Sequence, residues 1–314
     1  MTRGPRFERV LVPGLAVTVG VMLSLCGATA RGGDPSVAAL DPHRVAWREL
    51  HFEAHRLGIA AHIEIRLIAP TTARTDPPPS AQVGAGERSA VRGEGLWLES
   101  TTHLPGRTFL ARERLDPWRA AAFEIIDTET GARHHRKAYT LGDHGFALDL
   151  LEPASLTELM LDPERWTRHL TSVFSYPSSL GREPAVTGPA GLLYALAAGS
   201  VTTPGDSTIV NVLVQTQVER VTVAAEGVVP LQLDYEQFDG GNPTIVHARV
   251  AALRLVAHSS PVVDSSAPSA FRIFGLEGVV EILWDGQHRL PLEMSGQVKL
   301  LGHVEVRLAS LTLR

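Results

Sequence analysis

The residues best suited to chemistry lie on one face of a predicted hairpin near the start of the chain. Imidazole and carboxylate groups alternate with apolar residues there, and both are common zinc ligands. Residues four apart on a strand lie about 13 Å apart, so one ion reaches only part of such a face. The subset that fits one ion is Glu53, His55 and His62, on a face that also carries His51 and Glu64. The pattern favours an alternative, a solvated face of cross-strand acid–histidine pairs.

Two further histidines, His134 and His135, stand within a basic run from Arg133 to Lys137. Neighbouring residues on a strand point to opposite faces, so we do not expect the two imidazoles to chelate one ion together. The surrounding cations would also repel a metal. We interpret the run as a wet basic patch, whose contact with anionic lipid headgroups would be weak.

The sequence contains no familiar catalytic signature. It has no Gly-x-Ser-x-Gly elbow, His-Glu-x-x-His helix, Walker loop or dinucleotide glycine fingerprint. The run from Asp127 to Gly131 faintly resembles an aspartic-protease loop, but its glycine is misplaced, so we interpret it as a turn. The only cysteine, Cys26, lies in the predicted export signal, which argues against cysteine catalysis. A triad assembled from scattered Ser, His and Asp residues stays an open alternative.

Large apolar side chains form a second kind of candidate site, for an apolar ligand. Curved β-barrels with helices across one opening hold lipids inside. The alternative, which the pattern favours, is that the same side chains are ordinary core between helices and sheet. The residues that would line such an opening are Trp166, Phe174, Leu192, Leu193, Leu196 and Trp284.

Strands must position most of these residues, because the dominant hydrophobic period of the chain is two. Apolar and polar residues alternate on both sides of Leu57-Gly58, which predicts an antiparallel hairpin with one buried face. A two-residue turn there sets Phe52 opposite Ile63 and Glu53 opposite His62, so both faces become complementary. Further strands are predicted at about 95–103, 107–115, 119–127, 132–141, 145–151, 208–225, 228–237, 244–258, 270–284 and 288–313.

Two short helices are predicted between the two sets of strands. Asp162-Pro163 is typical of a helix start, and Trp166 and Phe174 then share one helical face. A second helix is predicted to begin at Pro189 and to end at Gly199. The sequence therefore predicts an all-β fold with two short helices, as a large curved antiparallel sheet or open β-barrel with the helices near one opening.

The predicted organisation is a single β domain over residues 44–314, with a helical insertion at about 155–200. A stretch rich in Pro, Gly, Ala and Ser at 70–94 is predicted to be a mobile surface loop rather than a linker, because strands resume directly after it. Residues 31–43 are predicted to be a flexible segment before the domain.

The N-terminus is typical of an export signal covering residues 1–30. Three arginines precede an apolar run to about Leu25, and a small-x-small pattern follows at Ala28 to Ala30. The apolar run is short for a spanning helix of about 20 residues, so we expect no transmembrane span in the mature chain. The expected location is the periplasm, with an outer-membrane lipoprotein anchored through Cys26 as the minor alternative.

Charge and composition exclude one class of partner. The 314-residue chain has 29 basic and 34 acidic residues, a net charge of −5 and only 6% aromatic residues. Nucleic-acid binding calls for a basic stripe or a stacking surface of aromatic rings. We therefore expect no nucleic-acid partner.

Two stretches near the ends of the predicted domain form a recognisable pair. The first runs from Trp47 to Leu67, and the second from Ile282 to Leu292, followed by Gly302 and an alternating tail. Together they resemble the ends of the secreted bacterial family known as domain of unknown function 3108. Ala61 stands where the family has glycine, and residues 155–205 do not match its pattern. The resemblance implies a secreted, β-rich envelope protein and implies no particular activity.

These observations favour a non-enzymatic, exported envelope protein that binds an amphiphile, such as a lipid, or a partner protein in a concave β-surface. No cofactor is expected. One alternative is a metal-dependent or hydrolytic enzyme built on the His/Glu face of the first hairpin. Another is a structural or assembly factor of the envelope that docks through an exposed strand edge.

Overall fold

The structure is a computed structural model of the chain. It describes residues 40–56, 58–69, 95–131, 133–181, 184–263, 268–299 and 301–314, which belong to one compact unit. The predicted signal at 1–30, most of the segment at 31–43 and the predicted loop at 70–94 lie outside the described residues. Pro42–Arg44, at the end of that early segment, forms the short 3-10 helix η1.

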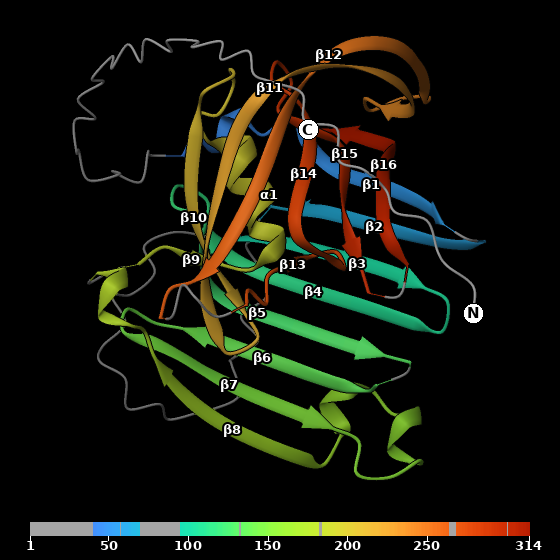
Figure 1. Ribbon diagram of the computed structural model, residues 1–314. Helices are drawn as coiled ribbons and strands as arrows, with labels where there is room; N and C mark the ends of the chain where they lie inside the picture. Colours follow the sequence, from blue (N-terminus) through green and yellow to red (C-terminus); the bar gives the residue numbers. More distant parts are fainter. Residues whose placement is uncertain are drawn as a thin grey trace, which may run out of the picture. The chain divides into compact units, whose positions relative to one another are not determined.

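One large sheet of sixteen strands dominates the described part of the chain (Figure 1). Its first half is an antiparallel meander in chain order, as the regular spacing of turns predicts. These strands are β1 (Trp47–Arg56), β2 (Ile59–Ile68), β3 (Leu96–Leu104), β4 (Arg107–Asp116), β5 (Ala121–Thr130), β6 (His135–Leu141), β7 (Gly145–Glu152) and β8 (Arg168–Ser175).

The second half of the sheet continues from the other edge of β1, through β16. The order from there is β16, β15, β14, β12, β11, β10 and β9, with β13 paired to β14. Most pairs are antiparallel, and the pair between β9 and β10 is parallel. These strands are β9 (Val186–Thr187), β10 (Ser207–Val214), β11 (Gln217–Phe238), β12 (Thr244–Pro261), β13 (Arg272–Ile273), β14 (Leu276–Asp285), β15 (Leu290–Val298) and β16 (Gly302–Leu313).

The predicted register of the first hairpin is confirmed. Strands β1 and β2 pair Phe52 with Ile63 and Glu53 with His62, and the ladder ends at Arg56 opposite Ile59. Phe52 and Ile63 are buried, whereas Glu53 and His62 are exposed. The alternation therefore places the His/Glu residues on the solvated side of the sheet.

Two predicted strands in the second half have different limits in the structure. The strand expected at 208–225 is divided by a tight turn at Gln215, whose φ of 55° lies in the left-handed region, into β10 and the start of β11. The break expected after residue 225 is only a bulge at Gly227 within β11. Pro291 lies in β15 beside a shift in register at Trp284, the kind of irregularity that a proline in a strand predicts.

One of the two predicted helices is confirmed and the other is wrong. Helix α1 (Pro189–Ala198) begins with proline and is followed by Gly199, as expected. At Asp162-Pro163 the chain forms only the 3-10 turn η3 (Pro163–Arg165), and the residues that follow form β8. Leu170 and Phe174 share a face in a strand as well as in a helix, and pairing with β7 decides for the strand. Two more 3-10 turns are η2 (Glu158–Met160) and η4 (Ser178–Leu180).

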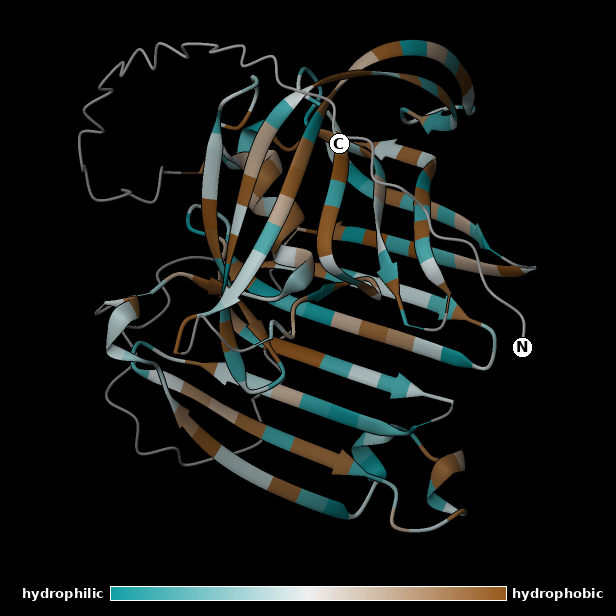
Figure 2. Cartoon of the chain, in the orientation of Figure 1, coloured by the Kyte–Doolittle hydropathy of each residue, from teal (hydrophilic) through white to brown (hydrophobic). Residues whose placement is uncertain are grey.

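The sheet closes on itself through β11. Its last residues pair in parallel with the end of β16, Glu236 with Ser310 and Phe238 with Thr312. Strands β11, β12, β14, β15 and β16 thereby form a ring rather than a regular barrel. The main hydrophobic core takes residues from these ring strands, from β1–β4 and from α1. All α1 residues from Ala190 to Ala198 are buried, and Figure 2 shows this helix coloured as hydrophobic.

A second core lies farther along the meander. Ile125, Tyr139 and Phe146 of β5–β7 pack in one cluster with Leu213 and Val218 of β10 and β11. We call the face of β3–β8 that carries Ile125 and Tyr139 the inner face. Among the described residues, no helix has both the length and the apolar character that crossing a membrane requires.

Candidate anion-binding pocket on the inner face

A row of ionisable side chains crosses the inner face of the meander. Strand pairing sets Asp127 opposite Lys137 and Glu129 opposite His135, and Glu113 lies diagonal to Asp127 on the next strand. Residues two apart on a strand share a face. All five therefore point to the same side of the sheet as the second core.

Glu113 joins this face to helix α1. Its side chain is fully buried, and its carboxylate accepts hydrogen bonds from the backbone N–H groups of Gly188 (3.1 Å), Ala190 (2.9 Å) and Gly191 (3.1 Å). The Thr187 hydroxyl donates a longer bond of 3.4 Å. The first N–H groups of a helix have no partner within the helix. A carboxylate from β4 therefore serves as the N-terminal cap of α1.

Two glycines make room for this carboxylate. A Cβ on Gly188 would lie 2.4 Å from an oxygen of Glu113, and a Cβ on Gly191 would lie 1.8 Å from the Thr187 hydroxyl. No ordinary side chain tolerates such approaches. Glycine at both positions thus lets the backbone come within hydrogen-bond distance of Glu113.

Burial governs the charge of the two carboxyl groups. It raises the pKa of Glu113 to about 7, with help from nearby Asp127, even though the backbone hydrogen bonds favour the ionised form. Burial also raises the pKa of Asp127 to about 6, against the lowering effect of Lys137. Asp127 keeps some contact with solvent, so the effect of burial is stronger for the fully buried Glu113. Carboxyl groups with raised pKa values mark an environment short of water.

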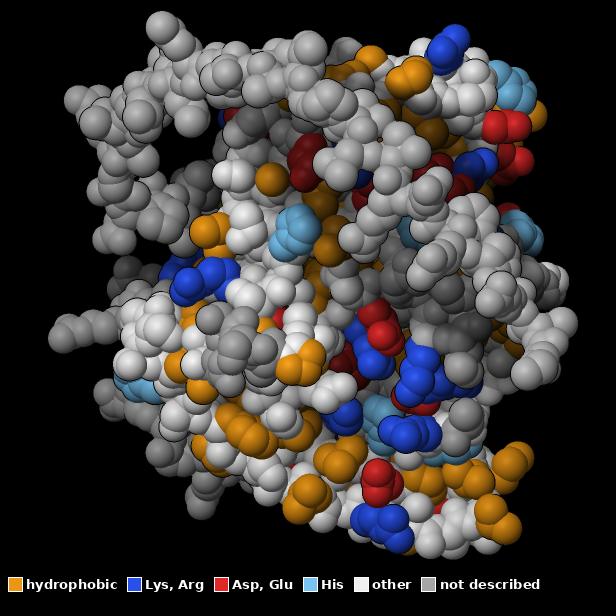
Figure 3. Space-filling model, in the orientation of Figure 1, with side chains coloured by type: hydrophobic (Ala, Val, Ile, Leu, Met, Phe, Trp, Pro, Cys, Tyr) orange, Lys and Arg blue, Asp and Glu red, His pale blue; other side chains and the backbone are white. Residues whose placement is uncertain are grey.

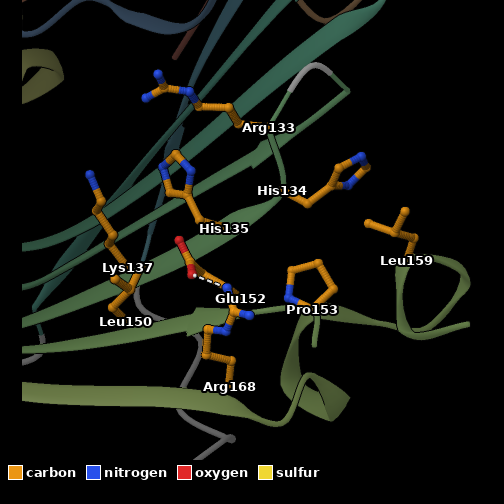
Figure 4. Close-up of a pocket in the computed structure, with 9 residues that line it drawn as sticks. All are labelled: Arg133, His134, His135, Lys137, Leu150, Glu152, Pro153, Leu159 and Arg168. Carbon is orange, nitrogen blue, oxygen red and sulfur yellow. Dashed lines mark hydrogen bonds and ion pairs between the residues drawn. The ribbon is translucent and has the colours of Figure 1, made fainter. Parts of the chain in front are cut away.

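The row of ionisable side chains ends at an open pocket, on the part of the inner face that the second core does not cover (Figure 4). The pocket has a volume of about 490 Å³, within the range of small-ligand sites. Basic, histidine and apolar side chains line it, together with a single carboxylate. The lining residues are Arg133, His134, His135, Lys137, Leu150, Glu152, Pro153, Leu159 and Arg168.

The pocket has an excess of positive charge. Its one carboxylate, Glu152, lies 3.5 Å from Arg168. Among the described residues Arg133 makes no ion pair, and Lys137 has Asp127 as its charged cross-strand neighbour. Burial, followed by the charge of Lys137, lowers the pKa of His135, so its imidazole is neutral at pH 7 and can donate or accept a hydrogen bond. Such a set of groups suits an anion.

The loop between β7 and β8 forms the apolar side of the pocket. Leu159 of η2 lines it. Trp166 is buried, its indole N–H donates a 2.9 Å bond to the carbonyl of Glu158, and its ring meets His134 edge-on at 6.3 Å. The two histidines that the sequence predicted to diverge both line the pocket, because His134 precedes β6 and strand alternation does not orient it.

The structure does not bring the six predicted apolar site residues together. Trp166 lies beside the pocket through His134, whereas Phe174 stacks on Phe146 at 4.9 Å in the second core. The other four are buried in the main core, where they pack between helix and sheet, and they line neither pocket described here. These four are Leu192, Leu193, Leu196 and Trp284.

The three predicted metal ligands lie on the solvated face, where Glu53 contacts both histidines. Glu53 lies 3.5 Å from His55 and 3.5 Å from His62, as expected for acid–histidine pairs. Glu53 and His55 also line a second pocket, of about 460 Å³, together with charged residues of both signs such as Asp234 and Arg307. Three carboxylates and two arginines line it, so it lacks the excess of positive charge found in the first pocket.

The closest metal-like group on this face is a different trio. Ligand atoms of Glu49, His51 and Glu64 lie within 4.8 Å of one another. Arg66 forms ion pairs with both carboxylates of this trio, at 3.2 Å from Glu49 and closer to Glu64. Although burial opposes it, hydrogen bonds from His51 and Arg66 lower the pKa of Glu49. An arginine therefore holds the position that an ion would take.

Sequence reasoning did not identify Glu113 or Glu158 as organising residues. The available signal for Glu113 was a carboxylate at an inward position of a strand, two residues before the buried Leu115. Its partners lie 74 or more residues away in the chain, so their identity could not be read locally. The basic run from Arg133 to Lys137 was identified, but not its position on the inner face.

Comparisons with protein-family models, curated proteins and solved structures gave no match. The resemblance to domain of unknown function 3108 stays a prediction from the residues that carry it. The case for a function therefore depends on the geometry and charge of the inner-face pocket.

Proposed function

We propose that this chain is an exported envelope protein that binds an anionic amphiphile without catalysis. The anionic head would bind to Lys137, Arg168 and Arg133, and the apolar chain would lie against Leu150 and Leu159. The observation that carries the proposal is the pocket itself, where unbalanced positive charge and apolar side chains meet on one open surface.

The chemistry of the pocket favours a phosphate or carboxylate head. Guanidinium and ammonium groups make short, charge-assisted bonds to such oxygens. The neutral His135 adds a donor without adding charge. Leu150 and Leu159 provide apolar contact area close to the charged groups, which a purely inorganic anion would leave unused.

A non-catalytic role fits the position of Glu113, the carboxyl group whose pKa is raised to about 7. General acid–base catalysis needs a carboxyl group that reaches its substrate. Both oxygens of Glu113 accept bonds from the α1 backbone, and the side chain is fully buried. We therefore assign Glu113 a structural role, as the cap of the helix that carries much of the core.

The proposed location follows from the sequence. The N-terminal pattern of three arginines, an apolar run and Ala28 to Ala30 is typical of secretory signals. Membership of the family known as domain of unknown function 3108 would agree with that location, and we keep it as part of the proposal.

Calorimetric titration with dodecyl phosphate, below the concentration at which it forms micelles, tests the proposal. Wild type should bind it, and dodecyl maltoside and inorganic phosphate should bind at least about tenfold more weakly, because each lacks one half of the ligand. Lys137→Met and Arg168→Met should each weaken dodecyl phosphate binding about tenfold. Arg112→Met is the matched control, since Arg112 pairs with Glu99 on the opposite face of the sheet.

Two results would contradict the proposal. One is the absence of dodecyl phosphate binding to wild type. The other is equal binding by wild type, Lys137→Met and Arg168→Met, which would place any binding elsewhere. Protein purified from its native host should also carry an anionic lipid detectable by mass spectrometry.

A further inference from the structure

Glu152 is the only carboxylate among the residues that line the inner-face pocket. A carboxylate repels the anionic head that the proposed function places among the basic side chains of this pocket. Figure 3 shows lysine, arginine and histidine side chains gathered at this end of the molecule, with hydrophobic side chains beside them. Glu152 is therefore the lining residue that can select among anionic heads, through a second group that is not an anion.

Strand pairing places Glu152 between a histidine and an arginine. It lies opposite Arg168 of β8, and its other side faces His135 of β6 (Figure 4). Lys137 pairs with Leu150, two residues before Glu152 on the same face. Diagonal neighbours on paired strands lie about 7–8 Å apart, within reach of long side chains. Lys137 and Glu152 can therefore contact two groups of one small head.

One carboxylate oxygen of Glu152 is free to accept a hydrogen bond from a ligand. Its Oε2 lies 3.5 Å from Nη1 of Arg168, which is long for a charge-assisted hydrogen bond. Its Oε1 has no hydrogen-bond or ion-pair partner within the described part of the chain. The side chains of Glu152 and Arg168 are 37% and 66% exposed, so a ligand can approach both. An ionised carboxylate only accepts hydrogen bonds, so Oε1 calls for a donor.

The loop between β7 and β8 holds Glu152 and Arg168 in place, because it begins directly after the first and ends directly before the second. The carboxylate of Glu158 ties the two ends of this loop together. It accepts hydrogen bonds from the backbone N–H groups of Ala154 (2.8 Å) and Thr167 (3.0 Å) and from the Thr167 hydroxyl (2.7 Å). These bonds lower the pKa of Glu158, so they persist at neutral pH. Glu152 and Arg168 thus lie at an ordered end of the pocket.

We propose that the ligand of the pocket is a phosphate ester whose head also carries a hydroxyl group, and that this hydroxyl donates a hydrogen bond to Glu152. The phosphate would bind to Lys137 and Arg133. Heads of this class are phosphate esters of glycerol, of a sugar or of another polyol. The inference rests on the proposed function, because it assigns the head of the same anionic amphiphile.

The charges of the pocket favour a hydroxyl group over an ammonium group. Both groups can donate to a carboxylate, but an ammonium group would lie close to three cationic side chains that repel it, Arg133, Lys137 and Arg168. A hydroxyl group donates without adding charge. Because Lys137 and Glu152 are diagonal neighbours, a hydroxyl a few bonds from the phosphate can reach Glu152 while the phosphate contacts Lys137.

Calorimetric titration with a matched pair of ligands, below their micelle concentrations, tests this assignment. Dodecyl hydroxyethyl phosphate and dodecyl methoxyethyl phosphate have the same charge and alkyl chain, and only the first carries a hydroxyl donor. Wild type should bind the first about tenfold more tightly than the second, and Glu152→Met should bind both equally. Glu124→Met is the matched control and should keep the preference, because Glu124 pairs with Arg114 (4.0 Å) on the opposite face of the meander.

The outcomes separate the choice of head from the proposed function. Glu152→Met should bind dodecyl phosphate at least as tightly as wild type, because it lacks the carboxylate that repels the head. The hydroxyl assignment is overturned if wild type binds the matched pair equally, or if Glu152→Met keeps the preference. Tighter binding of dodecyl aminoethyl phosphate than of the hydroxyethyl ester would overturn it in favour of an ammonium group. If wild type binds dodecyl phosphate but shows no preference, the proposed function stands alone, and absence of all binding overturns both.

Discussion

Glu113 and Glu49 show two ways in which this chain stabilises a carboxylate. Glu113 is fully buried and held by backbone N–H groups of α1, which lies far away in sequence. Glu49 lies on the solvated side of the first hairpin and pairs with Arg66 on the neighbouring strand. One carboxylate ties two distant parts of the fold together, whereas the other only balances charge on a surface.

The comparison shows which face of the sheet carries the electrostatic interactions that matter for stability. Loss of a buried acceptor leaves several backbone donors without partners in a medium that cannot solvate them. Loss of a surface partner is compensated by water and salt. The inner face therefore concentrates the electrostatic interactions that matter for folding, and the hairpin face can change with little consequence.

Replacing Glu113 should have the largest effect. Glu113→Ala leaves the N–H groups of Gly188, Ala190 and Gly191 without acceptors, and we expect a loss of about 4 kcal/mol in the free energy of unfolding. Urea denaturation measures it. Glu49→Ala, the surface counterpart, should cost less than about 1 kcal/mol. Equal losses in the two variants would show that the buried and the surface carboxylate contribute equally to stability.

The raised pKa of Glu113 predicts a specific pH dependence. Its folded value of about 7 lies above the usual 4.5, so the folded state binds the proton more tightly. The resulting stabilisation is complete below about pH 4.5 and is lost as the pH rises to about 7, by roughly 3 kcal/mol. Asp127, raised to about 6 from 3.8, acts in the same direction at slightly lower pH.

Unfolding of wild type and Glu113→Gln at a series of pH values between about 4 and about 8 measures this dependence. The glutamine variant cannot ionise, so the fall in stability toward neutral pH should be smaller and confined to the range of Asp127. A wild-type curve that rises between pH 5 and 7, or an unchanged slope in Glu113→Gln, would show that Glu113 is ionised at low pH.

Gly191→Ala should destabilise the chain, although alanine ordinarily favours helix by about 1 kcal/mol over glycine. The new Cβ would lie 1.8 Å from the Thr187 hydroxyl and 2.8 Å from Glu113, and the expected loss is about 2 kcal/mol. Adding Thr187→Ala should recover part of the loss, because it removes the nearer obstacle. A stabilised Gly191→Ala protein would mean that the cap is looser than the structure shows.

The parts of the fold that the sequence predicts are those with local signals. The first hairpin followed from a tight turn and matched faces, and α1 from Pro189 and Gly199. The segment after Asp162-Pro163 was misassigned because Leu170 and Phe174 fit both periodicities. Pairing of this segment with β7 decides that it is a strand, and residue propensities within the segment do not reveal that pairing.

The candidate site was less predictable than the fold. The basic run from Arg133 to Lys137 was visible, but its pocket needs Leu159 and Arg168, which only the return of β8 brings near. Glu113 depends on a helix beyond the next four strands of the meander. Closure of the ring through β11 and β16 likewise has no local signal.

Arg66→Met should have the smallest effect on folding and sharpens the surface half of the comparison. Arg66 is 47% exposed and pairs with Glu49 and Glu64, so its loss should cost about 0.5 kcal/mol or less.

The same change leaves Glu49, His51 and Glu64, whose ligand atoms lie within 4.8 Å, without a competing cation. Zinc, titrated by calorimetry at neutral pH, should bind this variant at least about tenfold more tightly than wild type, because two carboxylates and an imidazole are then available. His51→Ala in the same background should abolish the gain. If wild type binds zinc as tightly as Arg66→Met does, Arg66 does not compete with the ion. The hypothesis that the charged face of the hairpin is a metal site would then be supported.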